Sequence, residues 1–195
     1  MITVKPRREI IEYVEDVLQS VNLGKRGKYD GDKTAQRSGL LGEVVVKDLL
    51  GVPWIKNLDG FDGGFDIEIN GIKADVKTKG VGYKFQPWYD HIVNGYQIFF
   101  KVDVYIFASH SKTTDEINVW GWLPKSTFLA RANIRPKGSV VIRGGKPIIL
   151  WGDWYEVRNN QIIVINSTND LKKIFFRGRK VVETSGLLKA ISQTN

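Results

Sequence analysis

The chain has 195 residues, of which 42% are hydrophobic and 26% are charged, as is typical of one globular domain with a sizeable core. It contains no cysteine and two histidines, so disulfides and thiolate zinc sites are excluded and His-rich metal centres are disfavoured. The N-terminus lacks the apolar stretch of a secretion signal, and no segment approaches the roughly 20 apolar residues of a membrane span. We therefore expect an intracellular, cytoplasmic protein that does not bind a membrane.

The first two segments are predicted to be a helix and a linker. Residues 7–21 repeat apolar side chains at the spacing of an amphipathic helix, whereas residues 24–32 are polar and rich in glycine. The basic side chains of this linker could touch a phosphate backbone.

A second helix is predicted over residues 37–50, with Ser38 as its N-cap and Gly51 followed by Pro53 as its stop. Glu43 lies beside the apolar stripe of this helix rather than opposite it. Two interpretations stay open for Glu43: a carboxylate that points into a cleft, or an ordinary solvated glutamate. A short strand is expected next, near residues 52–56.

Residues 65–77 predict a β-hairpin, because Asn70-Gly71 between alternating residues is the strongest local signal for a type I′ turn. With this turn, Asp66 and Asp75 lie opposite each other on neighbouring strands. One face of the hairpin is then apolar (Phe65, Ile67, Ile69, Ile72, Ala74 and Val76) and the other ionisable (Asp66, Glu68, Lys73, Asp75 and Lys77).

Opposed carboxylates about 5 Å apart repel each other, so another interaction is expected to offset this repulsion in the hairpin. A divalent cation held between Asp66 and Asp75 supplies one, since Mg²⁺ and Mn²⁺ prefer hard oxygen ligands. The alternative is a solvated hairpin face on which Lys77 neutralises Asp75. Asp62, between Phe61 and two glycines, competes with Asp66 for the metal-binding position.

The middle of the chain alternates predicted loops, strands and helices. A loop is expected over residues 80–82, a helix over 87–97, buried strands over 102–109 and 117–123, and a helix over 125–133. Of the polar and aromatic residues in the predicted helix, some could face a cleft; they are Trp88, Tyr89, His91 and Gln97.

Residues 131–180 carry eleven basic and three acidic side chains and so account for the whole formal net charge of +8. Such a segment favours a polyanionic partner. Short β-like runs and turns alternate over 139–184, and a short helix is expected over 187–192. Aromatic residues among the basic ones could stack on unpaired bases or, as is more common in strands, belong to the core; they are Trp151, Trp154, Tyr155, Phe175 and Phe176.

The order of a helical Glu43, a hairpin Asp66 and Asp75-Val-Lys77 resembles the PD-(D/E)XK nuclease superfamily, which includes phage nucleases and junction resolvases. The resemblance covers residues 37–80 and extends more loosely to about 135. No proline precedes Asp66, a departure that the superfamily tolerates.

The resemblance implies an α/β fold of the restriction-endonuclease-like type, with a mixed central sheet flanked by helices and a small C-terminal β-rich elaboration. The chain is then a single domain made of an N-terminal helix and basic linker (1–36), a nuclease core (37–135) and the basic elaboration (136–195). Glu43, Asp66, Asp75 and the carbonyl of Val76 would hold Mg²⁺, with Mn²⁺ as a substitute, and Lys77 would act beside them as base or electrostatic anchor.

The implied activity is hydrolysis of phosphodiester bonds in DNA by an endonuclease, which could be structure-specific or junction-resolving. Cutting both strands needs two active sites, which favours a homodimer. Phosphate contacts are expected from basic side chains, namely Lys79, Lys172, Lys173, Arg177 and Arg179. Two other hypotheses remain, a catalytically inactive nucleic-acid-binding module of the same fold and a small interaction protein with an incidental charge.

Overall fold

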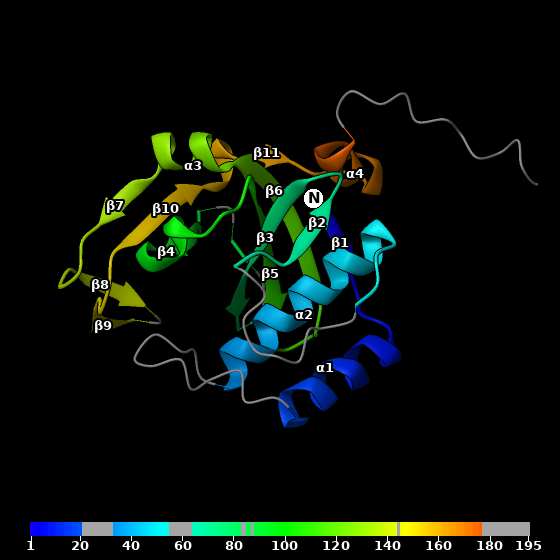
Figure 1. The fold of residues 1–195 in the computed structure, drawn as a ribbon. Helices are drawn as coiled ribbons and strands as arrows, with labels where there is room; N and C mark the ends of the chain where they lie inside the picture. Colours follow the sequence, from blue (N-terminus) through cyan, green and yellow to red (C-terminus); the bar gives the residue numbers. More distant parts are fainter. Residues whose placement is uncertain (21–32, 55–63, 83–84, 87, 144, 177–195) are drawn as a thin grey trace, which may run out of the picture.

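The computed structural model describes residues 1–20, 33–54, 64–82, 85–86, 88–143 and 145–176. These residues form a mixed α/β architecture around one main sheet, in which β3 and β5 are parallel and the other neighbours antiparallel (Figure 1). Its strand order is β1 (Ile2–Val4), β6 (Ile117–Pro124), β5 (Val104–Ser111), β3 (Ile72–Val81) and β2 (Ile67–Ile69), with β11 (Ile163–Val164) also paired to β6.

A second, smaller sheet and an additional hairpin lie beside the main sheet (Figure 1). The smaller sheet has the order β4 (Asp90–Asn94), β10 (Trp154–Arg158) and β7 (Asn133–Arg135), and the hairpin joins β8 (Val140–Arg143) to β9 (Lys146–Ile149). The helices are α1 (Arg8–Ser20), α2 (Lys33–Leu50), α3 (Lys125–Arg131) and α4 (Thr168–Phe175), with 3₁₀ turns η1 (Gly95–Phe99) and η2 (Asn159–Gln161).

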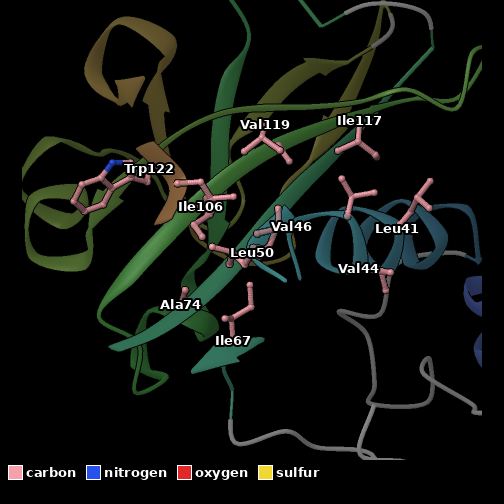
Figure 2. Close-up of a cluster of buried hydrophobic side chains, with 14 of the residues drawn as sticks. Leu41, Val44, Val46, Leu50, Ile67, Ala74, Ile106, Ile117, Val119 and Trp122 are labelled. Atoms are coloured by element: carbon pink, nitrogen blue, oxygen red, sulfur yellow. The ribbon is translucent and has the colours of Figure 1, made fainter. Parts of the chain in front are cut away.

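The main sheet separates two hydrophobic clusters. On one face, α1, α2 and α4 pack over alternate residues of β3, β5 and β6, such as Ala74, Ile106 and Ile117 (Figure 2). On the other face, Tyr105 and Phe107 of β5 pack with α3, β4 and β10. Because both faces of β5 are covered, every residue of this strand is buried, as the run of apolar residues predicts.

The predicted hairpin is confirmed as β2 and β3. Asn70 (φ 53°) and Gly71 (φ 78°) both take the left-handed conformation that a type I′ turn requires. The register pairs Ile67 with Ala74, Glu68 with Lys73 and Ile69 with Ile72, as predicted. Its apolar side chains lie in or against the cluster below α2, with one exception.

That exception is Phe65, and it corrects the predicted pairing of the two aspartates. The chain bends at Asp66, so the ladder ends at Ile67–Ala74 and Phe65 turns to the opposite face, where Lys73 Nζ lies 4.5 Å from its ring centroid. Asp66 and Asp75 are therefore not a ladder pair. The bend follows Gly64, whose φ is +84° and where a Cβ would meet the Phe100 ring at 2.8 Å.

Two local predictions about the second helix and the following loop differ from the structure. Ser38 is not an N-cap, because α2 already extends from Lys33 and the Ser38 side chain is buried. Residues 80–82 are not simply a loop, since β3 continues to Val81 beside β5. Gly51 ends α2 with φ +74°, as predicted.

The predicted helix over residues 87–97 is wrong. The segment contains β4, followed by η1, and its side chains alternate between partly and fully buried positions. His91 and Val93 are the fully buried ones, which is the period of two expected of a strand. The strand expected near 52–56 is not found in its described part, because residues 52–54 leave α2 in an irregular conformation. The linker, residues 55–56, Asp62 and the terminal helix lie outside the described residues.

The predicted helices over 7–21 and 125–133 and the strands over 102–109 and 117–123 are confirmed with shifted ends. The segment after residue 135 is β-rich, as predicted, but it is interwoven with the core. β10 is the central strand of the smaller sheet and α4 contributes Leu171, Ile174 and Phe175 to the main cluster. Within the described residues, no helix is long and apolar enough to cross a membrane.

Candidate functional site

A cleft of about 600 Å³ lies between α2, the open edge of β3, β4 and η1. All the residues predicted to bind metal or act in catalysis line it: Glu43, Asp66, Asp75, Val76 and Lys77. They come from a helix, the bend before β2, and the middle of β3. The fold thus gathers on one surface a set of residues that are far apart along the chain.

Glu43 reaches the cleft because α2 packs unusually close to β3. At Gly42, an added Cβ would lie 1.9 Å from Thr78 Oγ1, so only glycine allows this approach. The neighbouring Glu43 is then held at the edge of the sheet, where its Oε1 pairs with Lys47 Nζ at 2.5 Å. The interpretation of Glu43 as an ordinary solvated glutamate is therefore wrong, since the side chain is buried.

Asp66 immediately precedes β2, at the point beyond which β3 has no strand partner on this side. Its Oδ2 accepts a hydrogen bond of 2.7 Å from the Val76 backbone N–H, taking the place of a strand partner. The N–H and C=O of a strand residue point to the same side. The carbonyl of Val76 is therefore directed to the same open edge as the Asp66 carboxylate.

The pKa of Asp66 is affected by its burial and by two neighbouring carboxylates. Burial, together with the charges of Glu43 and Asp75, raises the pKa of Asp66 well above its usual value. Lys77 and the Val76 N–H oppose this shift without cancelling it. The three carboxylates are thus close enough to interact strongly, although no register pairs them.

Asp75 is nearly fully buried beneath the cleft and has one oxygen that is incompletely satisfied. Lys77 Nζ lies 2.7 Å from Asp75 Oδ2, yet among the described residues no hydrogen bond of good geometry reaches this oxygen. The neighbouring Tyr105 is also buried, and burial with the negative charge of Asp75 raises the pKa of its hydroxyl. Asp75 therefore presents a carboxylate oxygen with capacity for a further ligand.

Each carboxylate of the cleft pairs with a group of the protein itself. Glu43 pairs with Lys47, Asp66 with the Val76 N–H, and Asp75 with Lys77. Accordingly, within the described part of the chain no three His, Cys, Asp or Glu side chains are placed to hold one ion as they stand. Binding a cation would require the carboxylates to turn from these partners toward one another.

The basic residues predicted to touch phosphate are divided between two places. Lys79 lines the cleft, where its Nζ donates to the Asp90 carbonyl at 3.2 Å and lies 4.9 Å from the Tyr89 ring centroid. Lys172 and Lys173 lie on α4, beside the β2–β3 turn and away from the cleft lining. Arg177 and Arg179 lie outside the described residues.

Sequence reasoning missed several residues of the cleft. Lys112 follows β5 and lies at the same sheet edge as the end of β3, because the carboxyl ends of parallel strands meet. Gln36 of α2 also lines the cleft, as does Trp154 of β10, whose sequence context predicts only a base-stacking or core role. Of the residues considered earlier in 87–97, His91 and Gln97 line it as well.

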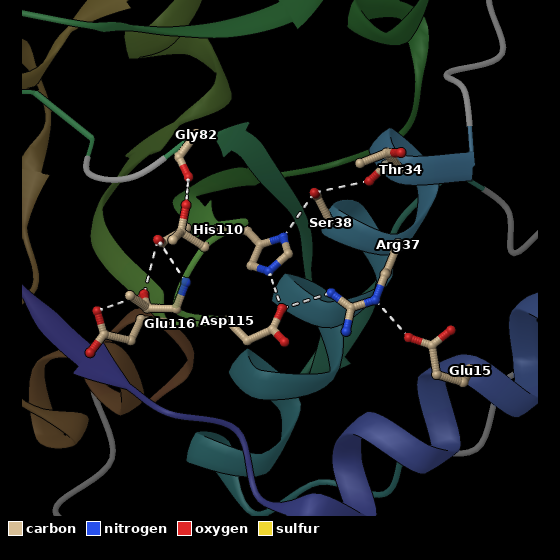
Figure 3. A network of polar contacts seen from close by, with 11 residues as sticks. Glu15, Thr34, Arg37, Ser38, Gly82, His110, Asp115 and Glu116 are labelled. Carbon is tan, nitrogen blue, oxygen red and sulfur yellow. Dashed lines mark hydrogen bonds and ion pairs between the residues drawn. The ribbon is translucent and has the colours of Figure 1, made fainter.

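A second polar network next to the cleft has the order Ser–His–Asp (Figure 3). Ser38 Oγ lies 2.9 Å from His110 Nδ1, and His110 Nε2 lies 2.9 Å from Asp115 Oδ1, which also accepts from Arg37 at 2.8 Å. Ser38 is only 1% exposed and does not line the cleft. No substrate could reach its hydroxyl, so this network ties α2 to β5 rather than supplying a nucleophile.

The burial of His91 predicts that the stability of the protein depends on pH. Burial lowers its pKa from 6.5 to about 4, although a hydrogen bond with Asn159 opposes the shift. Between these values the unfolded chain binds a proton that the folded protein does not, so stability falls as the pH is lowered through this window. The expected loss is about 3 kcal/mol, at about 1.4 kcal/mol per pKa unit.

Urea unfolding at a series of pH values between 7 and 4 measures this loss. His91→Gln keeps a hydrogen-bond donor for Asn159 but cannot titrate, so its stability should vary less with pH than that of the parent. Equal slopes for the two proteins would show that His91 is not responsible.

The chain has no match among protein-family models, curated proteins or solved structures. The geometry of the cleft therefore carries the functional argument.

Proposed function

We propose that the chain is a metal-dependent nuclease that hydrolyses phosphodiester bonds in DNA. The observation that carries this proposal is the convergence of three carboxylates, from α2, the bend before β2 and β3, on one cleft that also contains Lys77. Keeping three buried or partly buried carboxylates together is unfavourable without a positively charged ligand. Such an arrangement is characteristic of a functional site.

The residues of the cleft fit a Mg²⁺ or Mn²⁺ ion. Their donor set is made of hard oxygens, and Asp75 Oδ2 is buried without a hydrogen bond from the described residues. The pKa of Asp66 is raised by burial and by the negative charges of Glu43 and Asp75, which a cation would neutralise. Asp66, Asp75 and the Val76 carbonyl are the proposed ligands, with Glu43 beside them. When bound, the ion would lower the pKa of a water and stabilise charge on the phosphate.

The residues around this donor set have separate roles in the proposal. Lys77, now paired with Asp75, would be released when that carboxylate turns to the ion, leaving its ammonium beside the scissile phosphate. Lys79 and Lys112, on the rim of the same cleft, would attract and hold the neighbouring phosphates. The activity would be endonucleolytic, and a homodimer is proposed for the case of a duplex or junction substrate, because cutting two strands needs two active sites.

The test is a cleavage assay on plasmid, single-stranded and branched DNA in Mg²⁺, in Mn²⁺ and in EDTA. We expect strand scission with either ion and none in EDTA. Asp75→Asn, purified in the same way, is expected to be inactive and so excludes a contaminating nuclease.

Two other outcomes would contradict the proposal. DNA binding with a steep salt dependence but no cleavage in either ion would indicate a catalytically inactive binding module. If the chain shows no DNA binding and no cleavage, its positive charge serves another purpose.

A further inference from the structure

Exposed aromatic side chains gather beside the cleft. In the described part of the chain, five aromatic residues are exposed: Trp88, Tyr96, Phe99, Trp151 and Phe176. The first four surround the smaller sheet, and three of them are more than two-thirds exposed: Phe99 of η1 (82%), Trp88 before β4 (71%) and Trp151 before β10 (69%). Large aromatic side chains are normally at least partly buried, so a group of exposed ones on one side indicates a binding surface.

Three of these residues line one depression, which we call the aromatic hollow. It has a volume of about 610 Å³ and is walled by Tyr96, Phe99 and Trp151, with Ile148 and Ile149 of β9. The hollow adjoins the cleft, because Asn94, Tyr96 and Trp154 line both. A chain molecule whose scissile bond lay in the cleft would therefore enter the hollow with its next units.

The charges around the hollow favour a polyanion. Lys137 lines it and Lys146 is exposed on the adjoining β9, whereas Asp153 is the acidic residue of its lining and accepts a hydrogen bond from the Lys137 backbone N–H. Arg135 of the neighbouring β7 is bound to Glu156 at 2.5 Å, so its charge is already paired within the protein. Aromatic faces flanked by lysines are the combination that binds unpaired bases and their phosphates.

Resting on the proposed function, we propose that the aromatic hollow binds unpaired bases of the DNA strand whose phosphodiester bond lies in the cleft. A continuous duplex keeps its base faces stacked on one another and offers none to Phe99 or Trp151. The substrate class is therefore DNA with a single-stranded stretch next to the cleaved bond, such as a flap, a gap or a free strand.

The alternative occupant is a second copy of the chain. Val140 and Ile142 of β8 are exposed like Ile149 of β9, and such an apolar hairpin could pair with its equivalent. The position of the hollow beside the cleft and the lysines near it favour DNA, because neither feature would serve an apolar contact between identical copies. The test therefore also measures the oligomeric state of the chain.

The test measures binding in EDTA, where cleavage plays no part. The full-length chain is titrated into fluorescein-labelled (dT)₂₀ and into a labelled 20-base-pair duplex, and fluorescence anisotropy gives the two Kd values. Trp151→Ala and Phe99→Ala should each weaken (dT)₂₀ binding by about 5- to 150-fold, the range expected for the loss of one stacked base. Duplex binding should change less than 2-fold, and Trp151→Phe should retain most of the (dT)₂₀ affinity.

Phe176→Ala is the matched control, since it removes an exposed aromatic residue that does not line the cleft or the hollow. Unchanged (dT)₂₀ affinity in both hollow variants, or an equal loss for duplex, would overturn the inference. So would a dimer that becomes a monomer in the hollow variants, as measured by sedimentation velocity. If the hollow binds (dT)₂₀ as expected but the parent cleaves nothing in Mg²⁺ or Mn²⁺, the proposed function fails and this binding site stands.

Discussion

Replacing Asp66 by asparagine should stabilise the metal-free protein while strongly reducing cleavage. At neutral pH the folded protein either keeps Asp66 ionised in a buried site beside Glu43 and Asp75 or must bind a proton that is scarce at this pH. Both states are unfavourable for the folded protein. The unfolded chain has neither cost, because an isolated aspartate ionises near pH 3.8. The raised pKa thus lowers stability progressively as the pH rises above 3.8, and the penalty levels off above the pKa of the folded state.

The side chain introduced by Asp66→Asn would remain able to accept the hydrogen bond of the Val76 N–H but would carry no charge. We expect a gain of about 1 kcal/mol in unfolding free energy in EDTA at about pH 7.5, measured by urea denaturation. Cleavage in Mg²⁺ should fall by about 1,000-fold, since a bound metal supplies several kcal/mol of transition-state stabilisation. Mg²⁺ should raise the Tm of the parent and leave that of Asp66→Asn unchanged.

Glu68→Gln provides the matched control for Asp66→Asn. Glu68 lies two residues further along the same hairpin, but it is exposed and its contact with Lys73 is 4.0 Å long. Removing its charge should change stability by less than about 0.5 kcal/mol and leave cleavage unaffected. A parent that is more stable than Asp66→Asn in EDTA would contradict the electrostatic description of the cleft.

The second large effect is expected at Gly42. The Cβ of alanine would lie 1.9 Å from Thr78 Oγ1 and 2.8 Å from Thr78 Cβ, so α2 must move away from β3. Overpacking of this kind costs about 1–3 kcal/mol, of which the better helix propensity of alanine returns up to about 1 kcal/mol. Displacement of the adjacent Glu43 by about 1 Å should also reduce cleavage by on the order of 100-fold.

Gly39→Ala is a matched substitution one turn earlier in α2. Apart from its chain neighbours and the backbone of its own helix, no described atom lies within 4 Å of a Cβ at this position, so Gly39→Ala should be neutral or stabilising by up to about 1 kcal/mol. Thr78→Ala removes the closest clashing atom, Oγ1, which has no hydrogen-bond partner among the described residues. The double variant Gly42→Ala, Thr78→Ala should therefore recover stability, and a double-mutant cycle measures the coupling.

Equal unfolding free energies for Gly42→Ala and Gly39→Ala would show that α2 does not need glycine to approach the sheet. An additive double-mutant cycle would show that Thr78 is not the residue that alanine meets.

The hairpin could be predicted because its information is local. Asn70-Gly71 specifies the turn, and the alternation of apolar and ionisable residues fixes the register, so three ladder pairs agree with the prediction. The same register correctly predicts that Asp66 and Asp75 lie close together, since both line the cleft. It wrongly predicts that they are directly opposed residues of the ladder. The bend at Asp66 depends on Gly64 packing against Phe100, which is a contact between distant segments.

The side of the cleft formed by β4 and β10 could not be predicted, because it too depends on contacts between distant segments. The alternation of β4 covers only five residues and its partner β10 lies far along the chain, so local patterning favours a helix there. Ser38 has the residue type of an N-cap, but its hydroxyl is used in a buried contact with His110. The exposure of Trp151 likewise contradicts the common assignment of such a residue to the core.

The central position of β10 in the smaller sheet affects how the protein matures during synthesis. The chain leaves the ribosome N-terminus first, so the carboxylates are available long before Trp154, which completes the cleft. β4 and β7, which β10 joins, have no common partner among the described strands until it emerges. A nascent chain that ends before β10 therefore holds its acidic residues without Trp154, so the proposed active site is completed late in translation.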